Sequence, residues 1–396
     1  MQYSRLKNKY AIAGIGYTPQ GKVPGRTAAS FHAQACINAA KDAGVALQEV
    51  DGLLLYRHFP PVGEDIETTA FTVAEQLGIQ PAILGQEHYC TRNGLPQAIG
   101  LLESGLCNYV LISYGDNARS GKRSFVKEVI GEQATDELAA YGDMSTLAKY
   151  AMLARRAEYE FGTGAHVWKE IALAQRAWAQ LNPIAQMHGK PLTDEQYENE
   201  RMVVEPFRLL DATPVSDGGR AILLTSAKNA HRLKQPPVYI SGIGFANRPE
   251  SPYRHVPGDP YSAAAVAAKQ AFQMAGVTHK DIDACELYDC FTYTVESLLV
   301  DYGFCKANES GAFITRGRIG PGGALPVNTS GGMLSEAYFM GMTAICEAAM
   351  QLMGRAGERQ LGERTGTKAP KTIVCGDNGG VFQSHCTLIL SGGIQV

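Results

Sequence analysis

Apolar residues near the N-terminus form two short runs separated by a long segment with helical spacing. Tyr10 to Gly16 is an apolar run that ends in glycines, which is typical of a buried β-strand. In Ala28 to Ala43, Phe31 and a series of alanines fall on one helical face. A second apolar run, Gly52 to Tyr56, follows a polar turn. The order strand, helix, strand predicts the unit from which parallel sheets are built.

The same pattern recurs in the second half of the chain. Val238 to Phe245 repeats the first strand 228 residues after Tyr10, and Ala263 to Ala275 repeats the helix 232 residues later, so the copies differ by an insertion. A repeat this long is not a solenoid unit. It predicts a duplicated α/β half, with an N-terminal half over residues 1–235 and a C-terminal half over residues 236–396.

Further elements are expected between the two copies. Leu95 to Glu103 has helical spacing, Tyr109 to Ser113 is a buried-strand run behind it, and Asp217 to Thr225 returns to strand composition and closes the first half. Residues 116–211 are richer in charge and contain an amphipathic helix around 168–181. We expect them to form an inserted loop or cap region over the sheet.

Composition narrows the class of protein. The net charge is −3, and no cluster of Lys and Arg is interleaved with aromatic residues, so nucleic-acid and membrane-surface binding are not expected. No apolar run reaches the roughly eighteen residues of a membrane span, and the first residues lack a signal-peptide core, which favours a cytoplasmic protein. Nine cysteines without a Cys-x-x-Cys pair indicate reduced thiols and no metal site.

Several motifs together resemble the thiolase superfamily, in particular its sterol-carrier-protein-type thiolase and lipid-transfer branch. The resemblance covers nearly the whole chain. The segments that carry it are Asn182–Gln186, Glu205–Asp211 with Val215–Gly219, Glu286–Phe291, Asn328–Gly332 and Cys375–Gly380. It implies a five-layered αβαβα fold, a homodimer, and an acyl-CoA ligand that enters under the inserted loops.

The chain departs from the thiolase pattern at the cysteines. A thiolase needs a nucleophilic Cys at a helix N-terminus, where a nearby His and the helix dipole lower the thiol pKa. Cys90 opens a turn that is one residue too long for that role. An ungapped alignment places His88, and not Cys90, at the position of the nucleophile. Cys375 matches the second thiolase cysteine, at an expected strand end, and is compatible either with catalysis or with retained ancestry. Cys90 is equally compatible with a buried structural position.

Two tyrosines stand where the resemblance expects histidines. Tyr338 lies six residues after Gly332, at the place of the Cys-activating His, and Tyr288 precedes Asp289 where His is common. Each Tyr alone could be a packing residue. A Tyr titrates near 10, so it activates a thiol poorly, whereas it donates a proton well to an enolate. We therefore expect Tyr288 and Tyr338 to form an acid/base pair, with Asp289 orienting or polarising the adjacent group.

This pattern resembles the thiolase-like aldolases that remove the side chain of steroid CoA thioesters. It implies retro-aldol cleavage of a β-hydroxyacyl-CoA to a ketone or aldehyde and a shorter acyl-CoA, without an acyl-enzyme. Coenzyme A is then part of the substrate, with no permanently bound cofactor, and a small partner with an OB fold and a zinc ribbon is implied. Gly331, Gly332, Gly379 and Gly380 are candidate donors to the thioester oxygen.

Two other function classes stay open. One is a thiolase or acyltransferase that uses Cys90 and Cys375, and the other is a non-catalytic carrier of acyl-CoA or lipid. The sequence does not specify the acyl group, nor which tyrosine is the acid and which the base.

Overall fold

The computed structural model describes residues 4–56, 68–87, 94–121, 145–248 and 254–393. Its strands are β1 Tyr10–Tyr17, β2 Gly52–Tyr56, β3 Ile83–Glu87, β4 Tyr109–Asn117, β5 Met202–Val204, β6 Phe207–Arg208, β7 Asp217–Ser226, β8 Val238–Asn247, β9 Ala284–Leu287, β10 Thr372–Gly379 and β11 Ser384–Ser391. Its α-helices are α1 Ala28–Ala43, α2 Ala70–Leu77, α3 Leu95–Glu103, α5 Thr146–Phe161, α6 Ala165–Gln180, α7 Asp194–Glu198, α8 Ala227–Ala230, α9 Ala263–Ala275, α10 Thr292–Asp301, α11 Ser310–Phe313, α12 Arg316–Ile319, α13 Gly332–Ser335 and α14 Gly341–Leu352.

The strands confirm the duplication. The large sheet has the order β3-β2-β4-β7-β1-β8-β11-β10-β9, so β2-β4-β7-β1 of the first half matches β9-β10-β11-β8 of the second. Both sets have one parallel pair followed by two antiparallel pairs. The halves are joined by a short antiparallel contact in which Ala11 and Ile12 pair with Tyr239 and Val238.

The prediction of a parallel sheet is therefore only partly right. β2 and β4 are parallel, as are β9 and β10. However, β7 and β11 return antiparallel and lie between the first strand of each half and the parallel strands. The reason is that each half closes with an extra strand, so β1 and β2 share a direction without being neighbours.

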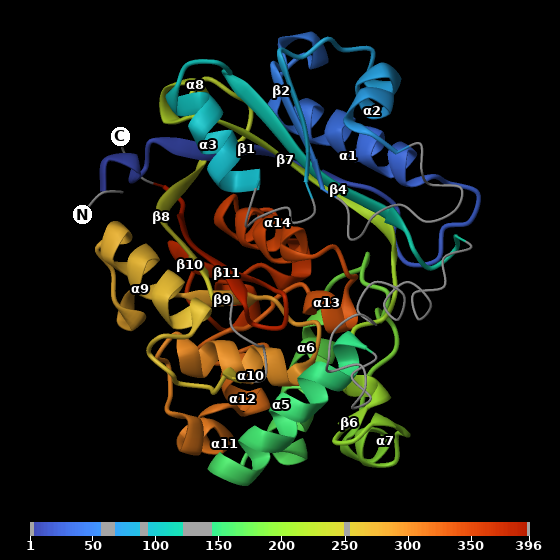
Figure 1. Ribbon diagram of the computed structural model, residues 1–396, viewed down its shortest axis with the longest axis vertical. Coiled ribbons are helices and arrows are strands. Elements are labelled where there is room, and N and C mark those ends of the chain that lie inside the picture. The colour runs from blue at the N-terminus through green and yellow to red at the C-terminus, as the bar shows by residue number, and fades with distance from the viewer. Residues whose placement is uncertain (1–3, 57–67, 88–93, 122–144, 249–253, 394–396) are drawn as a thin grey trace.

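The helices form layers around these strands, as the resemblance implied. α1 packs on β1, β4 and β7, and α2 lies beside it, whereas α9 packs on β8 and β11. α14 contacts β10 and β9 of the second half and β7 and β1 of the first, so it forms the central layer. Figure 1 shows α14 between the two sets of strands, with α1 and α2 above and α9 and α10 below.

Glycine explains the same close packing in both halves. A Cβ at Gly16 of β1 would lie 1.9 Å from the Ala35 carbonyl oxygen, and one at Gly244 of β8 would lie 1.9 Å from the Ala267 carbonyl oxygen. Each helix can therefore approach its strand only because glycine has no side chain at that point. Both helices also begin at a side-chain cap and end at a left-handed glycine.

The insertion contains α5, α6, α7 and the short β5–β6 ribbon. Strand β4 continues to Asn117, so the inserted elements follow that residue, and they end at a turn that includes Asp211. The predicted helix around 168–181 is α6, which begins earlier, at Ala165. α6 packs against α10, α12 and α13, and this places the insertion over the second half of the fold.

Candidate active site

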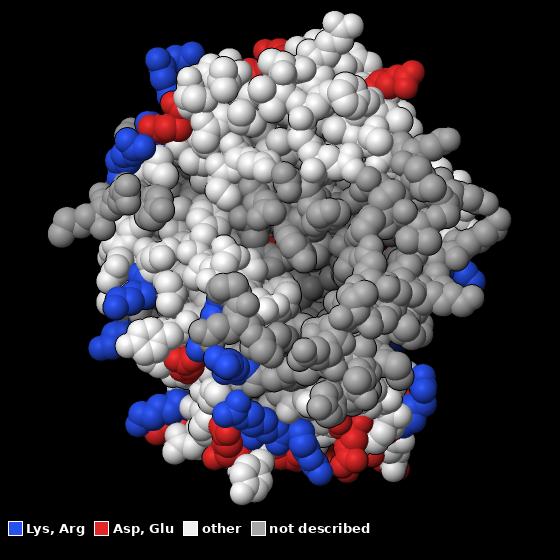
Figure 2. Space-filling view, viewed as in Figure 1, with Lys and Arg blue, Asp and Glu red and all other residues white. Residues whose placement is uncertain are grey.

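Tyr288 and Tyr338 meet at their hydroxyl groups. The two oxygens are 2.9 Å apart, and the rings cross edge to face with centroids 6.4 Å apart. Tyr288 directly follows β9, whereas Tyr338 lies in the connection between α13 and α14 rather than at the start of one long helix. Figure 1 places α13 and α14 near the middle of the molecule, and Figure 2 shows the charged residues of this face mostly toward its edges.

The two tyrosines have different surroundings. Tyr288 is buried, and burial, followed by the neighbouring Tyr338, raises its pKa well above the usual value for tyrosine. Tyr338 is only partly buried. Tyr288 therefore keeps its proton at neutral pH and can serve as a donor, while Tyr338 is the more exposed residue of the two.

The backbone around Tyr338 is held by motif residues from the first half. The Tyr338 N–H donates to Ser216 Oγ at 3.0 Å, and the Gln186 side-chain amide also donates to Ser216 Oγ. The Gln186 N–H donates to the Glu336 carbonyl oxygen at 3.0 Å. Asn182, from the same motif as Gln186, donates to the Ser330 carbonyl oxygen at 2.9 Å.

Arg220 contacts the chain on both sides of Tyr338, through a buried ion pair with Glu336 and through the ring of Phe339. Arg220 Nη2 donates to Glu336 Oε1 at 2.7 Å, and both side chains are almost fully buried. The Arg220 guanidinium also lies 4.5 Å from the ring centroid of Phe339 and 4.0 Å from that of Tyr17. These contacts tie the Tyr338 connection to β1 and β7.

Asp289 holds the glycine turn instead of touching the tyrosine hydroxyls. Its carboxylate accepts from the Met333 N–H at 2.9 Å and from the Leu334 N–H at 3.2 Å. These amides belong to the first turn of α13, where backbone donors lack partners within the helix. Asp289 thus fixes the turn that precedes Tyr338, and its orienting role in a reaction stays a prediction.

Burial raises the pKa of Asp289 to about 7. Because an unfolded Asp titrates near 3.9, the folded state binds a proton that the unfolded state releases between these values. The stabilisation by the protonated carboxyl is complete below about pH 4 and is lost as the pH rises through about 7.

We expect the free energy of unfolding to fall by up to about 4 kcal/mol from this group between about pH 4 and pH 7. Urea unfolding at several pH values should show that Asp289→Asn removes this part of the pH dependence. An identical pH dependence in the two proteins would contradict the assignment.

The four candidate oxyanion glycines differ in the use of their backbone amides. The Gly331 N–H donates to the Asn328 carbonyl oxygen at 2.9 Å, and the Gly332 N–H donates to Ser330 Oγ at 3.3 Å. Gly379 ends β10, and Gly380 begins the turn to β11. The Gly331 and Gly332 amides are thus engaged in their own loop, and Gly379 is paired with Ser384 in the β10–β11 ladder.

Of the two candidate cysteines, Cys375 lies within the described residues. Cys375 lies in the middle of β10, paired with Leu388 and Glu286, and not at a strand end as expected. It is buried, and burial raises its pKa well above the usual value for a thiol, which opposes thiolate formation. Cys90 and His88 lie outside the described residues.

Two further residues, Tyr150 and Asn378, border the tyrosine site, and neither was named as a candidate from the sequence. Tyr150 of α5 is among the groups that raise the pKa of Tyr288, and Asn378 of β10 donates to the Tyr150 hydroxyl at 2.8 Å. Asn378 belongs to the Cys375–Gly380 motif, so its place in a recognised segment was a usable signal. Tyr150 had no comparable signal, because it lies in the insertion.

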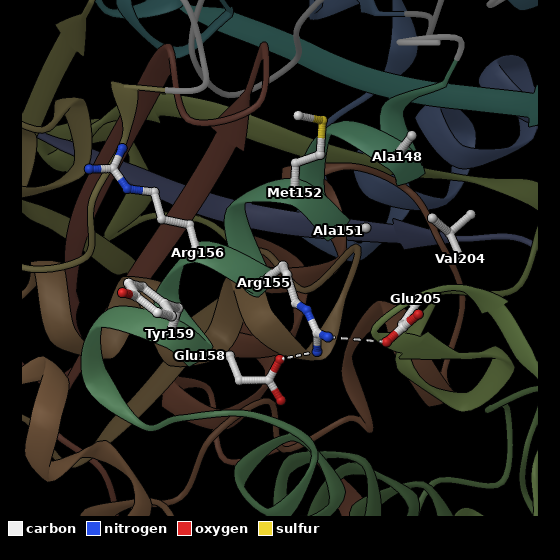
Figure 3. Close-up of a pocket in the computed structure, with 9 residues that line it drawn as sticks. All are labelled: Ala148, Ala151, Met152, Arg155, Arg156, Glu158, Tyr159, Val204 and Glu205. Atoms are coloured by element: carbon white, nitrogen blue, oxygen red, sulfur yellow. Dashed lines mark hydrogen bonds and ion pairs between the residues drawn. The ribbon is translucent and has the colours of Figure 1, made fainter. Parts of the chain in front are cut away.

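A separate cavity of about 890 Å³ opens on the outer face of α5. Figure 3 shows Arg155 pointing across it toward Glu158 and Glu205, with ion-pair distances of 2.6 and 3.3 Å. Its lining residues come from α5 and from the β5–β6 region, and none is a candidate catalytic residue. Arg155, Glu158 and Glu205 form ion pairs with one another, so the cavity does not change the location of the candidate site.

Comparisons with known proteins agree with this architecture. The family model described as "Thiolase C-terminal domain-like" matches residues 256–392. The chain is 33% identical over 88% of its length to 17-hydroxy-3-oxo-4-pregnene-20-carboxyl-CoA lyase of Mycobacterium tuberculosis, of which it covers 92%. It is 32% identical over 89% of its length to a steroid side-chain-cleaving aldolase of Thermomonospora curvata, again covering 92% of that protein.

Two further similarities bear on the reaction. An acetyl-CoA acetyltransferase of Methanothermobacter thermautotrophicus is 30% identical over 95% of the chain, which covers 98% of that protein. The solved structure titled "Ltp2-ChsH2(DUF35) aldolase" matches with a TM-score of 0.87 and 29% identity, over 99% of this chain and 100% of that one.

A duplicated α/β fold with a central helix layer and a site between the halves defines a thiolase-like protein. The chain belongs to the thiolase superfamily, in the branch that contains the steroid side-chain-cleaving aldolases. Among the described helices, none is both long and apolar enough to cross a membrane.

Proposed function

We propose that this protein cleaves a β-hydroxyacyl-CoA by a retro-aldol reaction and releases a ketone or aldehyde and a shorter acyl-CoA. The observation that carries this proposal is the pair of hydroxyls of Tyr288 and Tyr338, 2.9 Å apart. Two phenols in contact can move protons but activate a thiol poorly. The similarity to lyases and aldolases that act on steroid CoA thioesters supports the same reaction class and suggests a steroid side chain as the acyl group.

The surroundings of the two tyrosines suggest their roles. In its deprotonated form, which this step requires, Tyr338 removes the proton of the β-hydroxyl, and the bond between the α- and β-carbons breaks as the carbonyl forms. The bonding electrons form the thioester enolate, which takes a proton from Tyr288 at its α-carbon. Tyr338 is then protonated and Tyr288 is not, and one proton passed along the hydrogen bond between them restores the starting state.

The enolate oxygen needs hydrogen-bond donors that are already in place before the bond breaks. We assign this role to the backbone amides of Gly379 and Gly380. No permanently bound cofactor is needed, since coenzyme A arrives as part of the substrate. We further propose a cytoplasmic homodimer that works with a small OB-fold and zinc-ribbon protein, in line with the two-component title of the similar aldolase structure.

The test is product analysis by mass spectrometry. The purified chain, alone and co-expressed with the protein encoded by a neighbouring gene, is incubated with a panel of β-hydroxyacyl-CoA thioesters that includes steroid acyl groups. We expect equal amounts of a ketone or aldehyde and a shortened acyl-CoA. A product that requires added free CoA would support thiolysis instead, and tight binding without any product would support a carrier.

The acyltransferase alternative has one observation in its favour, the 30% identity to an acetyl-CoA acetyltransferase. Cys375→Ala separates the two reactions. A retro-aldolase should keep its kcat within about threefold, because Cys375 is buried and holds its proton, and because a small core truncation acts mainly on stability. Loss of turnover in a folded Cys375→Ala protein, together with a covalent acyl adduct in the wild type, would establish thiolase chemistry.

A further inference from the structure

Tyr150 joins the insertion to two loops of the second half. It lies on the buried face of α5 and is 2% exposed. Its ring centroid is 4.8 Å from that of Phe291 and 5.3 Å from that of Phe382. Phe291 lies three residues after Tyr288, and Phe382 lies in the turn that follows Gly380. A single ring thus packs on the loops that carry the proposed acid and the proposed oxyanion donors.

The Tyr150 hydroxyl forms hydrogen bonds with residues close to the same two loops. Asn378 Nδ2 donates to it at 2.8 Å, and the thiol of Cys290, two residues after Tyr288, also hydrogen-bonds it. The side chain of Asn378 is fully buried, and its Oδ1 has no hydrogen-bond partner among the described residues. The bond to Tyr150 is therefore the one hydrogen bond of this side chain among the described residues, and its loss would leave the whole buried amide without a partner.

We propose that Tyr150 and Asn378 are positioning residues of the proposed reaction, and that they act as a unit to fix Tyr288 relative to the Gly379–Gly380 turn. This inference rests on the proposed function. The turn needs such support, because Val381 and Phe382 have φ angles of 53° and 67° and are not glycines. Tyr150 is supplied by the inserted helix, so the insertion completes the geometry of the site as well as covering it.

A Tyr150→Phe substitution keeps the ring and removes the hydroxyl. We expect kcat to fall about tenfold, as for the loss of one buried hydrogen bond in a network, and KM to change less than about twofold, since the side chain is 2% exposed and is proposed to act through Tyr288. The matched control is Tyr159→Phe, also on α5 but 91% exposed, which should leave both constants unchanged. Equal values for Tyr150→Phe and wild type would overturn the proposal.

A second variant tests whether the two residues act as a unit. Asn378→Leu should lower kcat by a similar factor, and the double variant should be no worse than either single variant, because each substitution removes the same bond. Effects that multiply in the double variant would contradict the coupling. Asn378→Leu also keeps the test open if Tyr150→Phe does not fold.

A readout that needs no turnover separates this inference from the proposed function. With 3-fluorotyrosine placed at position 338, the fluorine resonance and its pH titration report the hydrogen bond from Tyr288. Tyr150→Phe should shift this resonance or its titration midpoint, whereas Tyr159→Phe should not. If Tyr150→Phe shifts the resonance but the wild type has no lyase activity, the proposed reaction is refuted and the positioning role of Tyr150 is supported. If Tyr150→Phe leaves the resonance unchanged, the positioning role is refuted.

Discussion

Tyr288→Phe and Tyr338→Phe are each expected to lower kcat by at least about 100-fold, the lower end of the contribution of general acid/base catalysis. Each substitution removes one hydroxyl of the pair that is 2.9 Å apart and leaves the ring in place. In the proposed reaction, the β-hydroxyl has no base without Tyr338, and the enolate has no acid without Tyr288. Steady-state kinetics on a cleaved β-hydroxyacyl-CoA gives kcat and KM for both variants.

The control for this experiment is Tyr261→Phe, because that side chain is 77% exposed and remote in sequence from both tyrosines. The double variant Tyr288→Phe/Tyr338→Phe should lose little more than the worse single variant, since the proposed cycle needs both groups. Near-normal turnover in both folded single variants would refute the acid/base assignment, whatever the products are.

Much of the fold could be predicted from the sequence, because the two halves repeat the same local signals. The predicted bounds of α1, β2 and α9 agree with the structure to the residue. These elements have uninterrupted apolar faces, and the two helices end at a glycine with positive φ, so local chemistry decides them.

The mixed direction of the sheet could not be predicted in the same way. Whether β7 lies beside β1 or at an edge depends on pairings between residues about 200 positions apart, such as Tyr10 with Ser226. A continuous apolar run looks the same in the sequence whether its strand pairs with a parallel or with an antiparallel neighbour. The strand-helix-strand order therefore suggested more parallel pairing than the sheet contains.

For the candidate site, counting from Gly332 was enough to select Tyr338, and the Asp-Cys-Phe segment was enough to select Tyr288. Their contact across 50 positions is then a property of the fold. Ser216 lies in the recognised Val215–Gly219 segment, but its contact with Tyr338 was not predicted. The supporting groups Arg220 and Tyr150 were not predicted either, because each acts through a long-range contact that leaves no periodic mark in the sequence.

Gly332→Ala is expected to have the second large effect, on both stability and turnover. Gly332 has a φ of +61°, and a Cβ there would lie 2.1 Å from Asp289 Oδ2. Left-handed backbone costs an alanine roughly 1–2 kcal/mol, and forcing extra volume into a packed site costs roughly 1–3 kcal/mol more. The free energy of unfolding from urea titration should therefore fall by about 2–5 kcal/mol.

Gly354→Ala is the matched control, because Gly354 has a similar φ of +70° and no atom within 4 Å of the added Cβ. It should show the backbone cost alone, roughly 1–2 kcal/mol, with normal kcat. In Gly332→Ala the Asp289 carboxylate must move, and with it the Met333 and Leu334 amides that set the path to Tyr338. A misplacement of about 1 Å can cost about 100-fold in rate, so kcat should fall far more than stability alone explains. Equal losses in the two variants would mean that the contact between Asp289 and the glycine turn does not position Tyr338.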